Sequence, residues 1–228
     1  MTNFKDVADM SMYQSSEVGR LVGINTTRVR RWLKGYNYYN GSDMRHIKPV
    51  LYRSDSKASS NYASFFDLID LLFAKQFLDN GISLQKLRKA LDEATDILGT
   101  NHFARETFFS DGKNIYLEVK KHGGNLLQLL SGGQWVIASI ILQLAKQIEF
   151  DHRTGFARRW IPQAGGGLII LDPLVSFGRP SIKKGVDTAS IYDLYIAEGE
   201  SIARVCSWMK LTPPEVEAAV KFETAIAA

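Results

Sequence analysis

The chain has 228 residues, 45% hydrophobic and 23% charged, which is ordinary for a globular protein with enough chain for one large domain or two to three small ones. Its 18 Gly and 6 Pro are near average usage and exclude collagen-like and low-complexity classes, and a single cysteine excludes a disulfide framework and a cysteine-based metal site. The net charge is a mild +4.

The distribution of this charge is more informative than its size. Residues 1–60 hold ten Lys or Arg against five Asp or Glu, whereas residues 168–228 hold six against eight. A basic head on a neutral-to-acidic body predicts that the head binds a polyanion. No stretch is long and apolar enough to span a membrane and the N-terminus lacks the layout of a signal peptide, so we expect a cytoplasmic protein with no membrane partner.

Residues 13–35 have the pattern of a helix-turn-helix. Ser15 or Ser16 is expected to cap a first helix, and Gly23 to end it in the left-handed conformation. Asn25 is expected to cap a second helix, whose Val29, Trp32 and Leu33 would face the first. Two short helices joined by a tight glycine turn are thus predicted at the basic end of the chain.

The segment from residue 36 to 61 is rich in Tyr, Asn, Gly and Ser and is interpreted as a β-wing, with a strand expected at Pro49–Arg53. Ser64 and Asp67 form a capping-box pattern, so a helix is predicted to begin there and to end near Gly81. Ser83 is expected to cap the helix after it.

The middle of the chain is predicted to hold a β-hairpin at Thr107–Val119 around Asp111-Gly112, followed by helices at Leu126–Leu130 and Gln134–Ile148. Gly165–Gly167 is interpreted as a flexible joint and not as a phosphate loop, because no Lys and Ser/Thr follow at the required spacing.

The last segment is predicted to begin with a strand at Leu168–Leu171 and to continue with three short helices. Thr212 and Glu215 are spaced as a capping box for the third helix, and the second and third helices again have a helix-turn-helix pattern. The predicted fold class is mainly α with minor β. The predicted domains are a winged helix-turn-helix at residues 1–100, a hairpin-and-helix connector at 101–166 and a small three-helix domain at 167–228.

The second helix of the head carries the strongest functional pattern, because no acidic residue interrupts positions 18–34. Thr27, Arg28 and Arg31 are expected to contact base edges, since the N-terminal part of a recognition helix enters the major groove and Arg commonly binds guanine there. A basic helix that is merely solvated is the alternative. The residues assigned to DNA binding are Arg20, Asn25, Thr26, Thr27, Arg28, Arg30, Arg31, Lys34 and Tyr36.

Enzyme signatures are weak. No two of the four histidines are at metal-ligand spacing on one helix, and no nucleophile motif or paired carboxylate site accompanies them. We therefore expect no catalytic residues, no metal and no cofactor. An enzyme acting on nucleic acid is kept as an alternative that would need turnover with added metal.

Arg158, Arg159 and Trp160 form a second candidate site. Arg and Trp are enriched among the residues that dominate protein interfaces, so the three are interpreted as a contact with a partner protein. An ordinary surface pair of arginines is the alternative.

These motifs carry a resemblance to known families. Residues 12–36 resemble the first helix-turn-helix of MerR-like regulators, and residues 168–228 resemble a widespread bacterial domain long catalogued as of unknown function. The motifs in the second match are Arg179-Pro180, Ile182, Gly185-Val186, Thr188, Ile191, Gly199–Ser201, Val205, Leu211-Thr212, Val216 and Phe222.

With further motifs in the same order, residues 12–224 resemble one branch of the VapB-type antitoxins. Those motifs are Phe65–Leu68, Gly81–Leu84, His102–Ala104, Thr107–Gly112 and Arg159–Pro162. The resemblance implies an antitoxin that binds and silences a PIN-domain ribonuclease toxin, represses its own operon and works as a homodimer or in a hetero-oligomer with the toxin. A stand-alone MerR-like transcription regulator without a toxin partner is the alternative.

Overall fold

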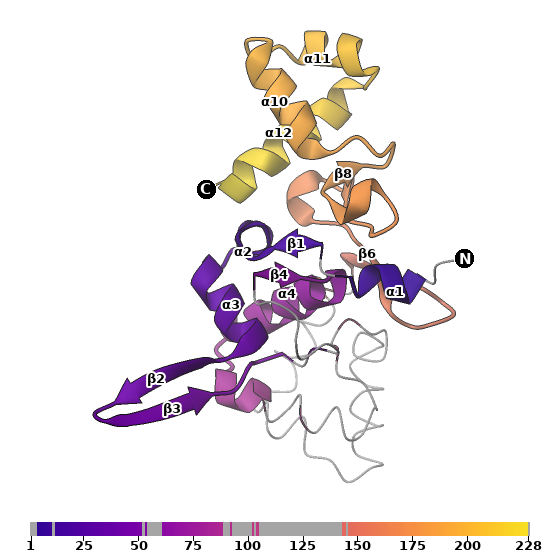
Figure 1. The fold of residues 1–228 in the computed structure, drawn as a ribbon. Coiled ribbons are helices and arrows are strands. Elements are labelled where there is room, and N and C mark those ends of the chain that lie inside the picture. Colours follow the sequence, from indigo (N-terminus) through magenta and orange to yellow (C-terminus); the bar gives the residue numbers. More distant parts are fainter. Residues whose placement is uncertain are drawn as a thin grey trace. The chain divides into compact units, whose positions relative to one another are not determined.

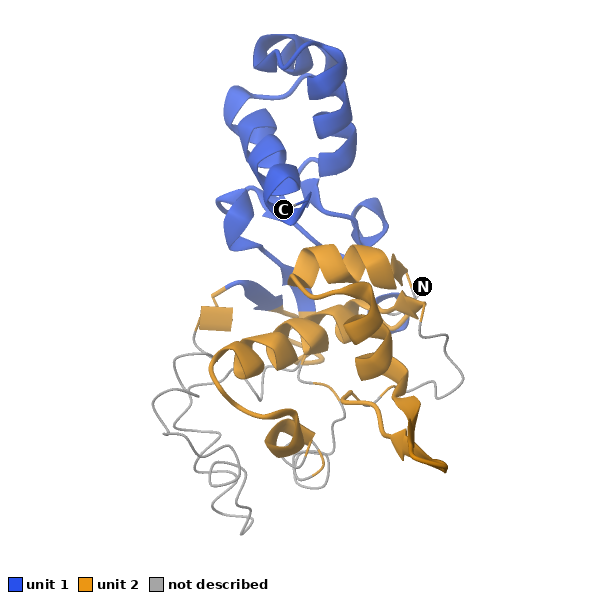
Figure 2. Ribbon diagram, turned by 90° about the vertical axis from the view of Figure 1, so that its left-hand side faces the viewer, with its two compact units in different colours: residues 1–8, 147–149, 158–228 blue, residues 9–146, 150–157 orange. Residues whose placement is uncertain are grey.

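The computed structural model describes residues 4–10, 12–51, 53, 61–88, 92, 102, 104, 143–144 and 146–227. Helices and two-stranded sheets make up these residues, which confirms the predicted mixture of α and minor β structure. They form two compact units, coloured separately in Figure 2. One unit consists of residues 9–146 and 150–157, and the other of residues 1–8, 147–149 and 158–228. We call them the N-terminal unit and the C-terminal unit.

The N-terminal unit is built around one buried helix. Its elements in chain order are β1 (Tyr13–Gln14), α2 (Ser15–Val22), α3 (Thr26–Lys34), β2 (Tyr36–Asn40), β3 (Asp43–Ile47), β4 (Tyr62–Ala63) and α4 (Phe65–Asp79). β1 pairs antiparallel with β4, and β2 with β3 (Figure 1). α4 is apolar around most of its circumference, as expected of a helix surrounded by packing partners, and α2 and α3 both contact it.

The start of α4 confirms the capping-box prediction. The Ser64 hydroxyl accepts a hydrogen bond from the Asp67 backbone N–H at 3.1 Å, and the Asp67 carboxylate accepts one from the Ser64 N–H at 2.9 Å. The helix ends at Asp79, and Gly81 follows with a φ of +84°. Residues 84–88 begin the next helix, where the Lys86 N–H donates to the Ser83 hydroxyl at 3.4 Å.

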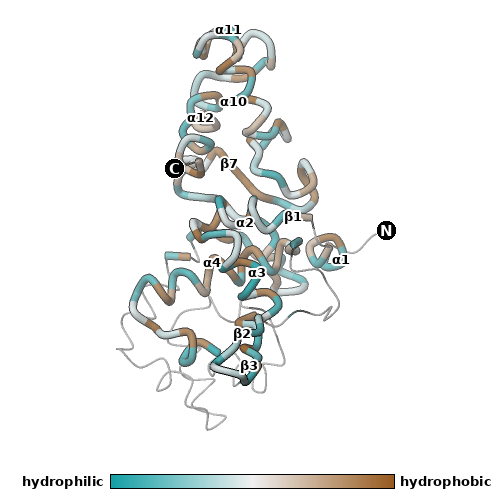
Figure 3. The backbone as a smooth tube through the Cα atoms, turned by 60° about the vertical axis from the view of Figure 1, so that its left-hand side comes forward, coloured by the Kyte–Doolittle hydropathy of each residue, from teal (hydrophilic) through white to brown (hydrophobic). Residues whose placement is uncertain are grey.

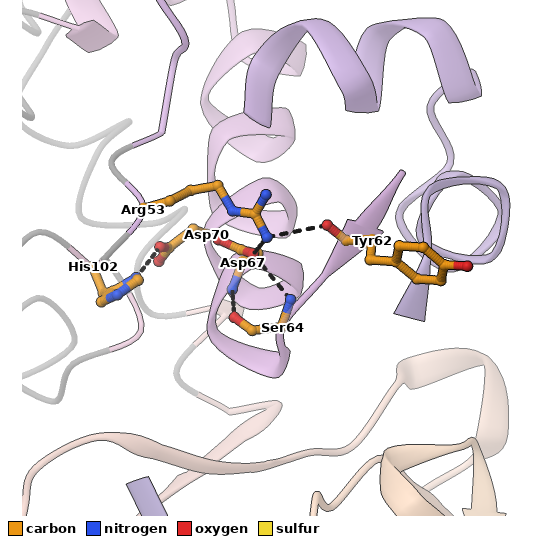
Figure 4. A network of polar contacts seen from close by, with 6 residues as sticks. All are labelled: Arg53, Tyr62, Ser64, Asp67, Asp70 and His102. Atoms are coloured by element: carbon orange, nitrogen blue, oxygen red, sulfur yellow. Dashed lines mark hydrogen bonds and ion pairs between the residues drawn. The ribbon is translucent and has the colours of Figure 1, made fainter. Parts of the chain in front are cut away.

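Two buried carboxylates on α4 hold flanking segments in place (Figure 4). Asp67 pairs with Arg53 at 2.8 Å, and Asp70 accepts hydrogen bonds from the His102 ring and from the Ala104 N–H at 2.7 and 2.9 Å. Burial raises the pKa of Asp70, against the opposing effect of His102. Burial lowers the pKa of His102, but the charges of neighbouring carboxylates, Asp70 foremost, outweigh it and raise the value overall.

The C-terminal unit joins a small hairpin to a three-helix bundle. Its elements are α1 (Phe4–Ala8), η1 (Gln163–Gly165), β7 (Ile169–Ile170), η2 (Ser176–Gly178), β8 (Ser181–Ile182), α10 (Thr188–Ala197), α11 (Ile202–Met209) and α12 (Pro213–Ala227). α12 contacts α10, α11 and both strands of the hairpin, with Val216, Ala219 and Phe222 buried. Figure 3 shows β7 in the brown of hydrophobic residues. β5 (Ile148–Phe150) pairs with β6 (Ala157–Trp160), and both strands include residues of each unit.

Three local predictions differ from the structure. α2 begins at Ser15 with Gln14 as its N-cap and no side-chain cap, so neither Ser15 nor Ser16 caps it. The expected strand at Pro49–Arg53 is absent from its described residues, and the strands of the wing lie earlier. The helix predicted at Gln134–Ile148 ends before residue 146, since Ile148 begins β5.

The predicted hairpin at 107–119, the helix at 126–130 and the domain boundary at 100/101 lie outside the described residues. In the last segment the three predicted helices are confirmed as α10, α11 and α12.

Candidate nucleic-acid interface

The turn between α2 and α3 is tight because two glycines permit it. Gly23 has a φ of +75° and donates its N–H to the Gly19 carbonyl, which confirms the predicted left-handed end of the helix. A Cβ on Gly19 would lie 2.6 Å from the Ile24 carbonyl oxygen, a distance that side chains do not tolerate. Gly19 therefore lets the turn lie directly against α2, and Ile24 is buried there.

α3 starts at a side-chain cap and presents one apolar face to the core. The Asn25 carboxamide accepts a hydrogen bond from the Arg28 N–H at 2.7 Å, which confirms the predicted cap. Val29, Trp32 and Leu33 are buried, as the spacing predicted. Since the apolar face is inside, the remaining faces of α3 carry its charge.

All the basic residues assigned to DNA binding are exposed: Arg20, Arg28, Arg30, Arg31 and Lys34. Asn25, Thr27 and Tyr36 are also exposed, and Thr26 is half-buried. Within the described part of the chain, no salt bridge engages any of these five cations. A surface whose positive charges are not neutralised by salt bridges is electrostatically suited to phosphate.

Aromatic rings hold two of these arginines. The Arg31 guanidinium lies 4.6 Å from the centroid of the Tyr36 ring, and that of Arg28 lies 5.9 Å from the centroid of the Trp32 ring. Such contacts restrict a long side chain while leaving its N–H groups available as donors. Tyr36, assigned from sequence to DNA binding, therefore also positions Arg31.

α3 leads directly into a β-ribbon, which we call the wing (β2 and β3). Gly35 allows this connection, because its φ is +75° and an added Cβ would lie 2.3 Å from the Ile47 carbonyl oxygen. The strands pair from Tyr36 with Ile47 to Asn40 with Asp43, closing through a turn that has Gly41 at a φ of +68°.

The wing exposes side chains that the sequence analysis did not assign to the site. Tyr38, Tyr39, Met44 and Arg45 are all exposed, and Tyr39 is 73% exposed. Figure 3 shows α3 and β3 mostly in the teal of hydrophilic residues. The turn between Asn40 and Asp43 is Gly41-Ser42, and a glycine at the first position of a two-residue turn is a sequence signal that could have located this ribbon.

The second candidate site divides between surface and interior. Arg158 is exposed, whereas Trp160 is buried and its indole N–H points to the Gln147 carboxamide oxygen at 3.5 Å. Arg159 donates to Asp172 from two nitrogens at 2.9 and 3.1 Å, and to Glu149 at 2.8 Å. The three residues are consecutive in β6, but only Arg158 is fully available at the surface.

Neither a metal cluster nor a membrane helix is found in the described residues. They include no group of three His, Cys, Asp or Glu side chains that could hold a metal ion. The helices among them are all too short or too polar to cross a bilayer.

Comparisons with known proteins connect the chain to antitoxins and to transcription regulators. It is 22% identical over 185 residues to a Mycobacterium tuberculosis protein named "Putative antitoxin VapB45", a match that covers 75% of this chain and 77% of that protein. It is 33% identical over 90 residues to the HTH-type transcriptional regulators Mb1861 of Mycobacterium bovis and Rv1830 of M. tuberculosis, both named as uncharacterized. Those matches cover 40% of this chain and 39% of each regulator.

One solved structure has the same fold. The crystal structure of Rv2018 from M. tuberculosis aligns with a TM-score of 0.65 at 17% identity, covering 92% of this chain and 98% of that chain. No protein-family model matches the chain. The names of the relatives confirm the resemblance to VapB-type antitoxins with a helix-turn-helix.

Proposed function

We propose that this protein is a DNA-binding antitoxin that neutralises a PIN-domain ribonuclease toxin and represses its own operon. The observation that carries the proposal is the exposed cationic face of α3, whose charges have no salt-bridge partner among the described residues. The relative named as an antitoxin, matched over 75% of this chain, supports the second half. The protein acts by binding and catalyses no reaction of its own.

In this proposal α3 is the recognition helix. Its first turn brings Thr27 and Arg28 to the base edges, and Arg31, held against Tyr36, follows one turn later. Backbone N–H groups at this end of the helix, together with Asn25 and Thr26, bind a phosphate. The remaining phosphate contacts come from Arg20, Arg30, Lys34 and Tyr36.

The exposed aromatic and basic side chains of the wing add contacts beside the recognition helix. Tyr39 and Arg45 are the candidates, since both are exposed on the ribbon that follows α3. Operators usually have two half-sites, so we propose that the protein binds DNA as a homodimer or as a hetero-oligomer with the toxin.

The toxin contact is proposed to include residues of β6. Arg158 is the exposed cation there and reaches a carboxylate of the toxin directly. Arg159 and Trp160 support the strand that carries Arg158, Arg159 through its bond to Asp172 and Trp160 through its contact with Gln147. An Arg158→Ala/Arg159→Ala variant is therefore expected to inhibit the toxin less well, and unchanged inhibition would contradict the assignment.

A stand-alone transcription regulator is the second candidate function. It is favoured by the 33% identity to the two HTH-type regulators, which exceeds the identity to the antitoxin-named relative although it covers a shorter stretch. The two candidates share the DNA-binding face and differ only in the protein partner.

Co-expression separates the two candidates. The proposal requires a PIN-domain protein encoded beside the gene. The two proteins are produced together and tested for co-purification and for suppression of ribonuclease activity. An antitoxin forms a stable complex in which RNA cleavage is lost. Free PIN-domain protein with undiminished activity, alongside retained binding to the DNA upstream of the gene, supports the stand-alone regulator instead.

A further inference from the structure

The connection between β7 and β8 exposes two large apolar side chains. Leu174 is 56% exposed and Phe177 is 88% exposed, although both belong to a ten-residue stretch between paired strands. We call residues 172–179 the Phe177 loop; it leads into β8, which is labelled in Figure 1. Among the described residues, the Phe177 ring is left almost fully exposed.

The base of this loop is firmly built. Asp172 is 1% exposed; one carboxylate oxygen accepts the Leu174 N–H at 2.9 Å and the other accepts two N–H groups of Arg159. The backbone adds bonds from Val175 to the Asp172 carbonyl and from Gly178 to the Val175 carbonyl, at 2.8 and 2.9 Å. These bonds fix the path of the chain, so Phe177 is held outward by a defined turn.

The tip of the loop adopts a backbone conformation that its residues disfavour. Ser176, Phe177 and Gly178 have φ values of +49°, +55° and +77°. Glycine takes such values freely, but an aromatic residue does so only at a cost in folding free energy. The exposed ring gains no burial to offset this cost within the unit. Backbone strain of this kind is typical of sites where binding uses the strained residue.

The charges around the loop indicate what its partner carries. Arg179 at the end of the loop and Lys183 just after β8 are exposed, and so is Arg158 of β6. None of the three forms a salt bridge with another described residue. Arg158 lies two residues before Trp160, which pairs with Leu171 immediately before the loop. An apolar tip fits an apolar pocket bordered by carboxylates when cations are near it, here Arg179 and Lys183 next to it in the chain and Arg158 on the strand bridged to Leu171.

We propose that the Phe177 loop is the docking surface of this protein for its protein partner, with Phe177 and Leu174 entering an apolar pocket and Arg158, Arg179 and Lys183 facing carboxylates at its rim. The inference rests on the proposed function, because the partner it names is the PIN-domain toxin. Arg159 is a positioning residue in this account, since its bonds to Asp172 hold the base of the loop.

The test uses full-length protein and the PIN-domain protein encoded beside its gene, with the dissociation constant measured by calorimetry. Phe177→Gly removes the ring and relieves the backbone, so we expect binding to weaken about tenfold or more while the melting temperature stays the same or rises. Ile196→Ser is the matched control, because Ile196 is a half-exposed apolar residue of α10 outside the loop, and its affinity should be unchanged. An Arg179→Glu/Lys183→Glu variant should weaken binding, and Lys221→Glu on α12 should not.

The possible outcomes separate the inference from the proposed function. If wild-type protein does not bind the PIN-domain protein, the proposed function and this inference both fail. If wild-type protein binds and Phe177→Gly binds equally well, only the inference is overturned. If Phe177→Gly changes the oligomeric state in light scattering while its affinity for the PIN-domain protein is unchanged, the loop binds a second copy of this chain and the inference is likewise overturned.

Discussion

The described part of the chain contains two helix-turn-helix turns that are built alike from different residues. In the N-terminal unit, left-handed Gly23 is followed by buried Ile24 and by the cap Asn25. In the C-terminal unit, left-handed Lys210 with a φ of +54° is followed by buried Leu211 and by Thr212, whose N–H donates to the Glu215 carboxylate at 2.8 Å. The same order of a left-handed residue, a buried apolar residue and a capped helix start thus arises twice.

The helices that follow the two turns differ in charge. α3 carries Arg28, Arg30, Arg31 and Lys34 with no acidic residue, whereas α12 carries three glutamates and the single cation Lys221. An anionic helix face repels a phosphate backbone as strongly as a cationic one attracts it. The comparison shows that the two turns share a backbone pattern and differ in charge, and in the proposed function the positive charge of α3 makes it the DNA-binding helix.

The largest expected loss of stability comes from a substitution that disrupts the first turn. Gly19→Ala places a methyl group where the Ile24 carbonyl oxygen lies 2.6 Å away, and we expect a loss of about 3 kcal/mol in the free energy of unfolding. The equivalent position in the second turn is Cys206, whose carbonyl accepts the Lys210 N–H and whose side chain is half-buried there. Chemical denaturation measures the loss.

Gly199→Ala is the control for this substitution. Gly199 has a positive φ, of +64°, unlike Gly19 within α2, and no atom lies within 4 Å of an added Cβ. Its cost is expected to be about 1 kcal/mol, from the backbone conformation alone. Equal costs for the two variants would contradict the close approach at the first turn.

The next largest effect is on DNA affinity, and it tests the difference in charge between α3 and α12. Arg28→Ala and Arg31→Ala are each expected to weaken binding to the DNA upstream of the gene by about 1–3 kcal/mol, because each loses a base contact. Lys221→Ala on α12 removes the same charge from the other second helix and should leave the affinity unchanged. Fluorescence anisotropy provides the measurement, and wild-type affinity in both arginine variants would refute the placement.

The smallest effect distinguishes the units by their response to pH. The pKa of His102 is raised above its ordinary value of 6.5. Its contribution to the free energy of unfolding is therefore complete below pH 6.5 and is lost as the pH rises through the raised value. The pKa of Glu215 is lowered below 4.5, chiefly by the hydrogen bond from the Thr212 N–H. The contribution of Glu215 to the free energy of unfolding is therefore present above pH 4.5 and is lost as the pH falls through the lowered value.

Hydrogen exchange, corrected for the intrinsic rate, follows α4 and α12 separately. Protection of α4 should fall as the pH rises above 6.5, and His102→Gln should flatten that profile. Protection of α12 should fall as the pH drops below 4.5, and Glu215→Gln should flatten it. Identical pH profiles for the two helices would show that these groups do not set the local stability.

Local signals in the sequence predicted the first turn and the start of α4 well. The caps at Asn25 and Ser64 and the left-handed Gly23 involve residues at most four apart, so their spacing alone specifies them. The burial of Val29 and Leu33 followed from helical periodicity in the same way.

Contacts between residues far apart in the sequence could not be predicted from local spacing. The bond from Arg159 to Asp172 spans 13 residues, and it turns an apparent surface arginine into a support for the Phe177 loop. The strained backbone of Phe177 has no signature in the sequence, since aromatic residues rarely adopt it. The strand expected at Pro49–Arg53 failed for a related reason: Val50 and Leu51 instead donate to the Trp32 carbonyl at the end of α3.

The central claim is that the charge of α3 selects DNA, and the ratio of two affinities tests it most directly. The full-length protein is titrated with the DNA upstream of its gene and with a scrambled duplex of equal length at one salt concentration. We predict that the wild type prefers its own DNA by about a thousandfold or more, and that Arg28→Ala/Arg31→Ala loses most of this preference while Lys210→Ala/Lys221→Ala keeps it. A preference that survives in the double arginine variant would contradict the account.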